Sequence, residues 1–254
     1  MTKPRSQKKF PWPAAILGAV GVGLIVMAVV FRSPKKTVTT KTSTVDTSAI
    51  TIATPDGLQL SATIKYPIRN VQVPAVILLH EYGQDRHQWD PYIQQFNDAG
   101  YAVLSYDMRG FGASRLKSIP ANQAEHLKSL GADVPAVISY LEQQPSINHD
   151  RISLIGASIG ANVAFVAHSL HLNIYRTVLL SPVVRDGMET AYDAVGFSPQ
   201  NILGIADDKE ANDLHVFMKF VTGKKEEKII PGGEHGMALL SQPGLLNDII
   251  QWIK

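Results

Sequence analysis

The sequence has 254 residues, 45% hydrophobic and 18% charged, and it contains no cysteine, which excludes disulfide bonds, thiolate metal sites and a cysteine nucleophile. Its net charge of +2 is uneven, because the first 41 residues carry eight basic residues and no acidic one. The remainder keeps 16 of the 24 basic residues and all 22 acidic ones, a net charge of −6, which argues against nucleic-acid binding.

An apolar segment without charged residues runs from residue 10 to residue 31. As a helix its 22 residues would extend about 33 Å, the thickness of a bilayer core, and Trp12 suits the membrane interface. No A-x-A cleavage site closes the segment, so we predict an uncleaved transmembrane signal-anchor after a basic tail, residues 1–9. A cleaved signal peptide and a buried core helix are the alternatives.

A polar, threonine-rich stretch, residues 32–49, predicts a flexible tether to the rest of the chain. Four basic residues stand on each side of the apolar segment, so the positive-inside rule is nearly balanced. We favour a single-pass membrane protein whose N-terminus is cytoplasmic and whose domain, residues 50–254, is extracytoplasmic.

Strand-like apolar runs alternate with amphipathic helical runs from residue 50 onward. Residues 50–67 form two alternating runs around Pro55-Asp56-Gly57, a hairpin turn. Further strands are predicted at residues 74–80, 101–107, 151–156, 176–183, 201–206 and 228–230, and helices at residues 87–100, 133–144, 161–170, 211–221 and 245–253. This alternation predicts an α/β fold, a mostly parallel sheet with helices on both faces.

Binding and catalytic sites in such sheets form at the carboxyl ends of the strands. Ser158 stands at such an end, between a predicted strand and a predicted helix, with Gly156 and Gly160 two residues to either side. Small residues at these positions allow the close strand-to-helix approach of a nucleophile elbow. The alternative is a serine that only fills a tight turn.

A serine nucleophile needs a histidine base and a carboxylate that orients the histidine. His235 suits the base, because it lies among glycines between a short predicted strand and the last predicted helix. The acidic residues that follow strand 201–206 are Asp207, Asp208, Glu210 and Asp213. We prefer Asp208 as the triad acid, with Asp207 as second choice. A metal site is the alternative for this cluster, although its spacing is not that of a ligand set.

Several motifs together resemble the α/β-hydrolase superfamily over residues 50–254. The motifs are LLHEYGQDRHQW, YDMRGFGAS, GASIG, ADD and GGEHGMALL. The closest likeness is to small capless serine hydrolases related to dienelactone hydrolases and serine-aminopeptidase-like esterases. The resemblance implies an α/β-hydrolase fold with Ser158 as nucleophile, Asp208 as acid and His235 as base.

The same resemblance implies an oxyanion hole made by the backbone N–H groups of Tyr82 and Ile159. His80 and Glu81 would line the site, and Glu81 stands where the common His-Gly pattern has glycine. Dienelactone-type enzymes also carry a glutamate there, but with a cysteine nucleophile. Arg109 is expected to brace the neighbouring loop through a charge pair rather than to act in catalysis.

We therefore predict a membrane-anchored serine hydrolase, a carboxylesterase that forms an acyl-enzyme and needs neither cofactor nor metal. Only 18 residues separate Pro182 from Asn201, too few for a helical cap, so small or surface-presented esters are the expected substrates. Peptidase, lactonase or thioesterase activity in the same fold is one alternative. A non-catalytic binding module at the membrane surface is the other.

Overall fold

The computed structural model describes residues 47–116, 123–170, 173–184 and 199–254. The strands are β1 Thr47–Ala53, β2 Gln59–Lys65, β3 Val73–Leu79, β4 Ala102–Tyr106, β5 Ile147–Ala157, β6 Arg176–Leu180, β7 Ile202–Asp207 and β8 Lys225–Ile230. The helices are α1 Asp90–Asp98, α2 Gln123–Leu130, α3 Val134–Glu142, α4 Ile159–Ser169, α6 Ala211–Met218 and α7 Leu245–Ile253, with short 3-10 helices η1 Arg86–Trp89, η2 Gly131–Asp133 and η4 Gly236–Ser241.

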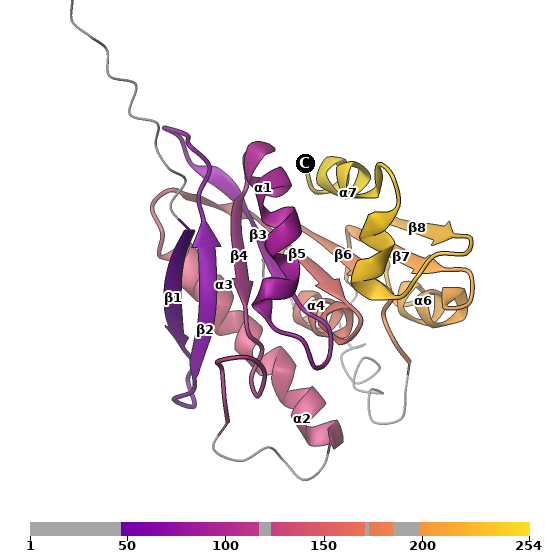
Figure 1. The fold of residues 1–254 in the computed structure, drawn as a ribbon, viewed down its shortest axis with the longest axis horizontal. Helices are drawn as coiled ribbons and strands as arrows, with labels where there is room; N and C mark the ends of the chain where they lie inside the picture. Colours follow the sequence, from indigo (N-terminus) through magenta and orange to yellow (C-terminus); the bar gives the residue numbers. More distant parts are fainter. Residues whose placement is uncertain (1–46, 117–122, 171–172, 185–198) are drawn as a thin grey trace, which may run out of the picture. The chain divides into compact units, whose positions relative to one another are not determined.

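The strands of the described residues form one eight-stranded sheet in the order β1-β2-β4-β3-β5-β6-β7-β8 (Figure 1). The β1–β2 hairpin is antiparallel, and β2 also runs antiparallel to β4. All pairs from β4 to β8 are parallel. The predicted mostly parallel sheet is thereby confirmed.

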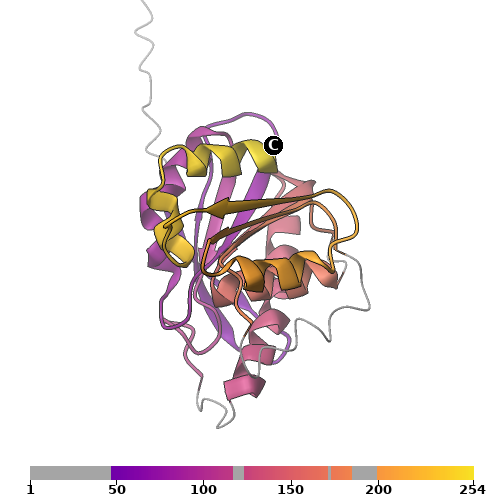
Figure 2. The ribbon, with the colours of Figure 1, turned by 90° about the vertical axis from the view of Figure 1, so that its right-hand side faces the viewer.

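Helices cover both faces of this sheet, as the apolar strands predict. Side chains alternate along a strand, and in β3 Ala75, Ile77 and Leu79 belong to one buried apolar cluster, whereas Val76 and Leu78 belong to another. The first cluster also takes its residues from α3, α4 and α6, and the second takes them from α1 and α7. Figures 1 and 2 show these two sets of helices on opposite sides of the sheet.

Three differences from the sequence prediction have a clear physical reason. Strand β1 begins at Thr47, inside the predicted tether and three residues before the predicted domain start, because Thr47 still pairs with Lys65. Strand β5 begins at Ile147, four residues early, since Ile147 pairs with Val73. Helix α2 was not predicted, because its sequence QAEHLKSL contains few apolar residues to reveal a helical period.

The N-terminal assignments fall outside the described residues. They are the basic tail, the apolar segment at residues 10–31 and the tether up to residue 46. Within residues 47–254, the described part holds no helix that combines the length and the apolarity needed to cross a bilayer.

Arg109 forms the expected charge pairs, but its partners are two carboxylates in the hairpin turn and at the start of α3. Its Nε donates to Oδ1 of Asp133 at 3.0 Å, and its Nη1 donates to Oδ2 of Asp56 at 2.9 Å. Asp133 is fully buried at the start of α3, whereas Asp56 stands in the exposed β1–β2 turn. The bonds from Arg109 and Thr54 lower the pKa of Asp56 to about 2. Arg109 is thus a structural link between the hairpin and α3.

Candidate active site

Ser158 occupies a sharp turn between β5 and α4. Its backbone has φ 53° and ψ −120°, a conformation that is strained for a residue with a side chain. A Cβ at Gly156 would lie 2.1 Å from the carbonyl oxygen of Gly160, and one at Gly160 would lie 2.5 Å from that of Leu79. Strand and helix therefore approach each other closely only because both positions are glycine, which is the geometry of the predicted elbow.

The substitution Gly160→Ala is expected to destabilise the fold by about 1–3 kcal/mol, because the new methyl group would collide with rigid backbone. Gly131→Ala is the matched control, since its methyl group would lie 3.6 Å from Cγ1 of Val166, an ordinary contact. Urea midpoints of the two variants and the wild type measure the difference. Equal midpoints for both variants would contradict a close approach at Gly160.

His235 lies directly before η4, and its turn is fastened to the sheet at two points. The N–H of Gly236 donates to Oγ of Ser181 at 2.9 Å, and the N–H of Met237 donates to Oε1 of Glu81 at 2.7 Å. Ser181 follows β6 and Glu81 follows β3, and these are the two strands that flank β5 in the sheet. The turn that carries His235 therefore lies across the end of β5, where Ser158 stands.

The carboxylate that contacts His235 is Glu210. Nδ1 of His235 and Oε1 of Glu210 are 2.6 Å apart. The predicted partners are engaged elsewhere: Oδ1 of Asp208 accepts the N–H of Gly232 at 3.1 Å, and Oδ1 of Asp207 accepts the N–H of Glu210 at 2.9 Å. In this geometry neither Asp208 nor Asp207, the second choice, is bonded to His235, and Glu210 takes the place expected for the acid.

The turn after β7 explains why Glu210, rather than Asp207 or Asp208, contacts His235. Asp207 ends the strand and is 5% exposed, and its Oδ1 and backbone oxygen both accept the N–H of Glu210. This bonding turns Asp208 outward to solvent and leaves Glu210 at the start of α6. The longer side chain of Glu210 then reaches His235. Its Oε2 is buried without a hydrogen-bond partner among the described residues.

The fourth acid of the cluster has a structural role. Oδ2 of Asp213 accepts the N–H of Val184 at 3.0 Å, so it fastens α6 to the segment that follows β6. In this way the four neighbouring acids divide into one that contacts the histidine and three that hold turns together.

The two predicted oxyanion donors lie on neighbouring strand ends. The N–H of Ile159 opens α4, and the first N–H groups of a helix have no acceptor within it. Tyr82 lies in the turn after β3, which is closed by a bond from the N–H of Gln84 to the oxygen of Glu81 at 3.2 Å. The side chain of Tyr82 is 50% exposed and packs edge-on against Phe111.

His80 supports this turn through hydrogen bonds that select one tautomer of its ring. Its Nε2 must accept, because the N–H of Met108 points at it from 3.0 Å, so its Nδ1 carries the proton and donates to the oxygen of Glu81. Burial of the ring lowers the pKa of His80, which favours the neutral form. His80 therefore shapes the turn and is not placed to exchange protons with a substrate.

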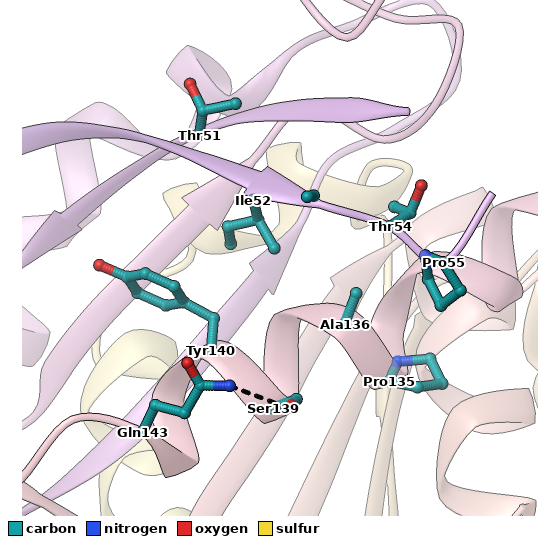
Figure 3. A pocket seen from close by; sticks show the side chains of 10 residues that line it. Thr51, Ile52, Thr54, Pro55, Pro135, Ala136, Ser139, Tyr140 and Gln143 are labelled. Atoms are coloured by element: carbon teal, nitrogen blue, oxygen red, sulfur yellow. Dashed lines mark hydrogen bonds between the residues drawn. The ribbon is translucent and has the colours of Figure 1, made fainter. Parts of the chain in front are cut away.

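A cavity of about 500 Å³ lies away from these residues, between β1 and α3 (Figure 3). Its lining includes Thr51, Ile52 and Pro55 from the hairpin and Tyr140 and Gln143 from α3. None of the candidate catalytic residues lines it. The cavity is therefore separate from the candidate active site.

Comparison with known proteins gives a family match that includes Ser158. The family described as Serine aminopeptidase, S33 matches residues 72–207. An Escherichia coli protein, described as an uncharacterized 31.7 kDa protein in the traX–finO intergenic region, is 33% identical over 114 residues. That match covers 43% of this chain and 37% of the relative, so the chain spans well under half of the relative's length.

Solved structures with little sequence identity share the fold. Dienelactone hydrolase from Anabaena variabilis has a TM-score of 0.62 at 18% identity, covering 82% of this chain and 94% of that one. Acetyl xylan esterase 1 from Thermoanaerobacterium has a TM-score of 0.66 at 15% identity, covering 85% and 84%. At these identities the likeness shows an α/β-hydrolase fold and nothing about substrate.

The family match ends at residue 207, before Glu210 and His235, so it carries no information on either residue. It does cover the strands from β3 to β7 and the elbow at Ser158, and it spans more than half of the chain. The chain therefore belongs to the serine aminopeptidase S33 family of the α/β-hydrolase superfamily.

Proposed function

We propose that the protein is a serine hydrolase that cleaves carboxylic esters, with Ser158 as nucleophile, His235 as base and Glu210 as acid. The observation that carries the proposal is the position of the His235 turn. It is hydrogen-bonded to residues that follow both strands flanking β5, and β5 is followed directly by Ser158, whose backbone is strained. A serine, a histidine and a carboxylate in this arrangement can perform acyl transfer.

In the proposed reaction, Nε2 of His235 takes the proton of Ser158 as Oγ attacks the ester carbonyl carbon. The imidazolium is stabilised by Glu210 at Nδ1, and it then gives the proton to the departing alcohol. Water, deprotonated by the same nitrogen, attacks the acyl carbon; the bond from that carbon to Oγ breaks, the carboxylic acid leaves, and His235 returns the proton to Oγ of Ser158. The N–H groups of Tyr82 and Ile159 would stabilise the oxyanion in both steps, each by about 3 kcal/mol.

The exposure of the site favours small or surface-presented esters as substrates. The side chain of His235 is 40% exposed, and that of Glu210 is 28% exposed. Because the base is this accessible, an ester can reach the site without entering a deep pocket. Water can also reach the acyl-enzyme directly.

The proposed activity is tested by comparing the rates of hydrolysis of two esters, p-nitrophenyl acetate and p-nitrophenyl butyrate, with that of an amide, alanine p-nitroanilide. We expect both esters to be hydrolysed by the wild type and the amide to react far more slowly, because an amine is a poorer leaving group than a phenolate. Equal rates on the amide would favour a peptidase instead. If none of the three compounds is turned over faster than by Ser158→Ala, a non-catalytic binding module is favoured.

We further propose that the sequence at residues 10–31 anchors the enzyme to a membrane, with its domain on the extracytoplasmic side. The support is the uncharged apolar sequence between two basic flanks. The full chain should stay with the membrane fraction after an alkaline carbonate wash, and Ile25→Arg with Val26→Arg should release it. Release of the unmodified chain by the wash would contradict the anchor.

A further inference from the structure

Glu81 connects two turns that the proposed reaction uses. It follows β3, one residue before Tyr82, whose N–H is the proposed oxyanion donor. Its carboxylate reaches across to the His235 turn, where Oε1 accepts the N–H of Met237 at 2.7 Å. A single side chain thus joins the turn of an oxyanion donor to the turn of the base.

Gln88 holds Glu81 in place through a reciprocal pair of hydrogen bonds. Nε2 of Gln88 donates to Oε2 of Glu81 at 2.6 Å, and Oε1 of Gln88 accepts the backbone N–H of Glu81 at 3.0 Å. Gln88 itself belongs to η1, which is anchored by the fully buried Trp89 and by the ion pair of Arg86 with Asp107. The carboxylate is therefore bonded on both oxygens, and its conformation is fixed.

Gly236 makes room for this contact. Its φ of 57° lies in the left-handed region, and a Cβ there would stand 1.9 Å from Oε1 of Glu81. Only glycine satisfies both constraints, so the residue after His235 and the glutamate fit each other. The close approach shows that the carboxylate packs directly against the backbone that carries the base.

We propose that Glu81 is a positioning residue that sets the distance between His235 and the oxyanion donor of Tyr82. The inference rests on the proposed function, because it concerns the same site. Catalytic groups must be held within about 0.5 Å of their productive geometry, and a misplacement of about 1 Å can cost roughly 100-fold in rate. Loss of the link therefore lowers kcat more than it raises KM.

The hydrogen-bond pattern allows a test by exchanging the two side chains. In Glu81→Gln, the new amide NH₂ faces the NH₂ of Gln88, so a donor meets a donor. In Gln88→Glu, two carboxylates face each other. In the double variant the amide at 81 donates to the carboxylate at 88, which also accepts the backbone N–H of residue 81, and the amide oxygen still accepts the N–H of Met237. The double variant restores all three bonds.

We expect each single variant to lower kcat for p-nitrophenyl acetate by about 10- to 100-fold with less than about a twofold change in KM. The double variant should recover to within about threefold of the wild type, a difference under 1 kcal/mol. A double variant as slow as the product of the single effects would overturn the proposal. So would a Glu81→Gln variant with the kcat of the wild type.

Urea midpoints of the four proteins separate positioning from folding. Should a single variant not fold, recovery of both the fold and kcat in the double variant would still support the link, and a folded but inactive double variant would overturn it. Phosphonylation of Ser158 by a fluorophosphonate separates this inference from the proposed function. A wild type that does not react contradicts the function, whereas a reactive wild type with an equally reactive Glu81→Gln contradicts the positioning role alone.

Discussion

Replacing Ser158 with alanine is expected to lower kcat/KM for p-nitrophenyl acetate by a factor of about 10⁴ or more. Without Oγ no acyl-enzyme can form, and what remains is the attack of water promoted by His235 and the oxyanion donors. The fold should be retained, because alanine differs from serine only in lacking the hydroxyl, and residue 158 is only partly buried. Initial rates, with protein concentrations matched by absorbance, measure the effect.

Ser139→Ala is the matched control for this prediction. Ser139 is an exposed serine on α3 that lines the cavity of Figure 3, and none of the candidate catalytic residues lines that cavity. Its replacement should leave kcat/KM unchanged. A loss of less than tenfold in Ser158→Ala would show that another group supplies the nucleophile.

Glu210→Gln should lower kcat by about 10⁴, the loss seen when a triad carboxylate becomes an amide and the histidine takes the wrong tautomer. The 2.6 Å contact with Nδ1 of His235 makes Glu210 the group that selects the tautomer. In Asp208→Asn, the amide oxygen can still accept the N–H of Gly232, so kcat should change by no more than about twofold, as for a surface substitution. The comparison decides between the two acids directly.

The reverse result would restore the assignment made from the sequence. A large loss in Asp208→Asn with little effect in Glu210→Gln would mean that the turn after β7 rearranges when substrate binds. Asp207→Asn is less informative, because Asp207 is buried and holds the N–H of Glu210, so its replacement would disturb both acids.

Most of the fold follows from patterns that act over a few residues. The strands β3, β4 and β7 are buried almost throughout, so their apolar runs stand out in the sequence. The turn sequence Pro55-Asp56-Gly57 predicts the hairpin, and Gly57 has the expected positive φ, 85°. Helix α2 offers no such signal, since its polar sequence is compatible with a loop.

The candidate site was predictable where a residue type is tied to a backbone position. Ser158 could be found because the glycines around it are required by close backbone contacts, of Gly156 with α4 and of Gly160 with the end of β3. The acid could not, because four acids lie within seven residues between the end of β7 and the first turn of α6, and the directions of Asp208 and Glu210 depend on hydrogen bonds to Gly232 and Asp207. The spacing of the acids along the chain does not predict those hydrogen bonds.

Two supporting residues have no recognisable signal in the sequence. Ser181 accepts the N–H of Gly236, and it looks like any serine after a strand, although its φ of 48° marks it in the structure. Gln88 lies among the polar residues of the first predicted helix, and its partner Glu81 is seven positions earlier. Contacts of this kind arise from tertiary structure alone.

The most direct test of the proposed activity is the intact mass of the protein after treatment with a fluorophosphonate, followed by peptide mapping. The proposed function predicts one phosphonyl group per chain, located on Ser158 and absent from Ser158→Ala. An unmodified wild type, or a group attached to a different serine, would contradict it.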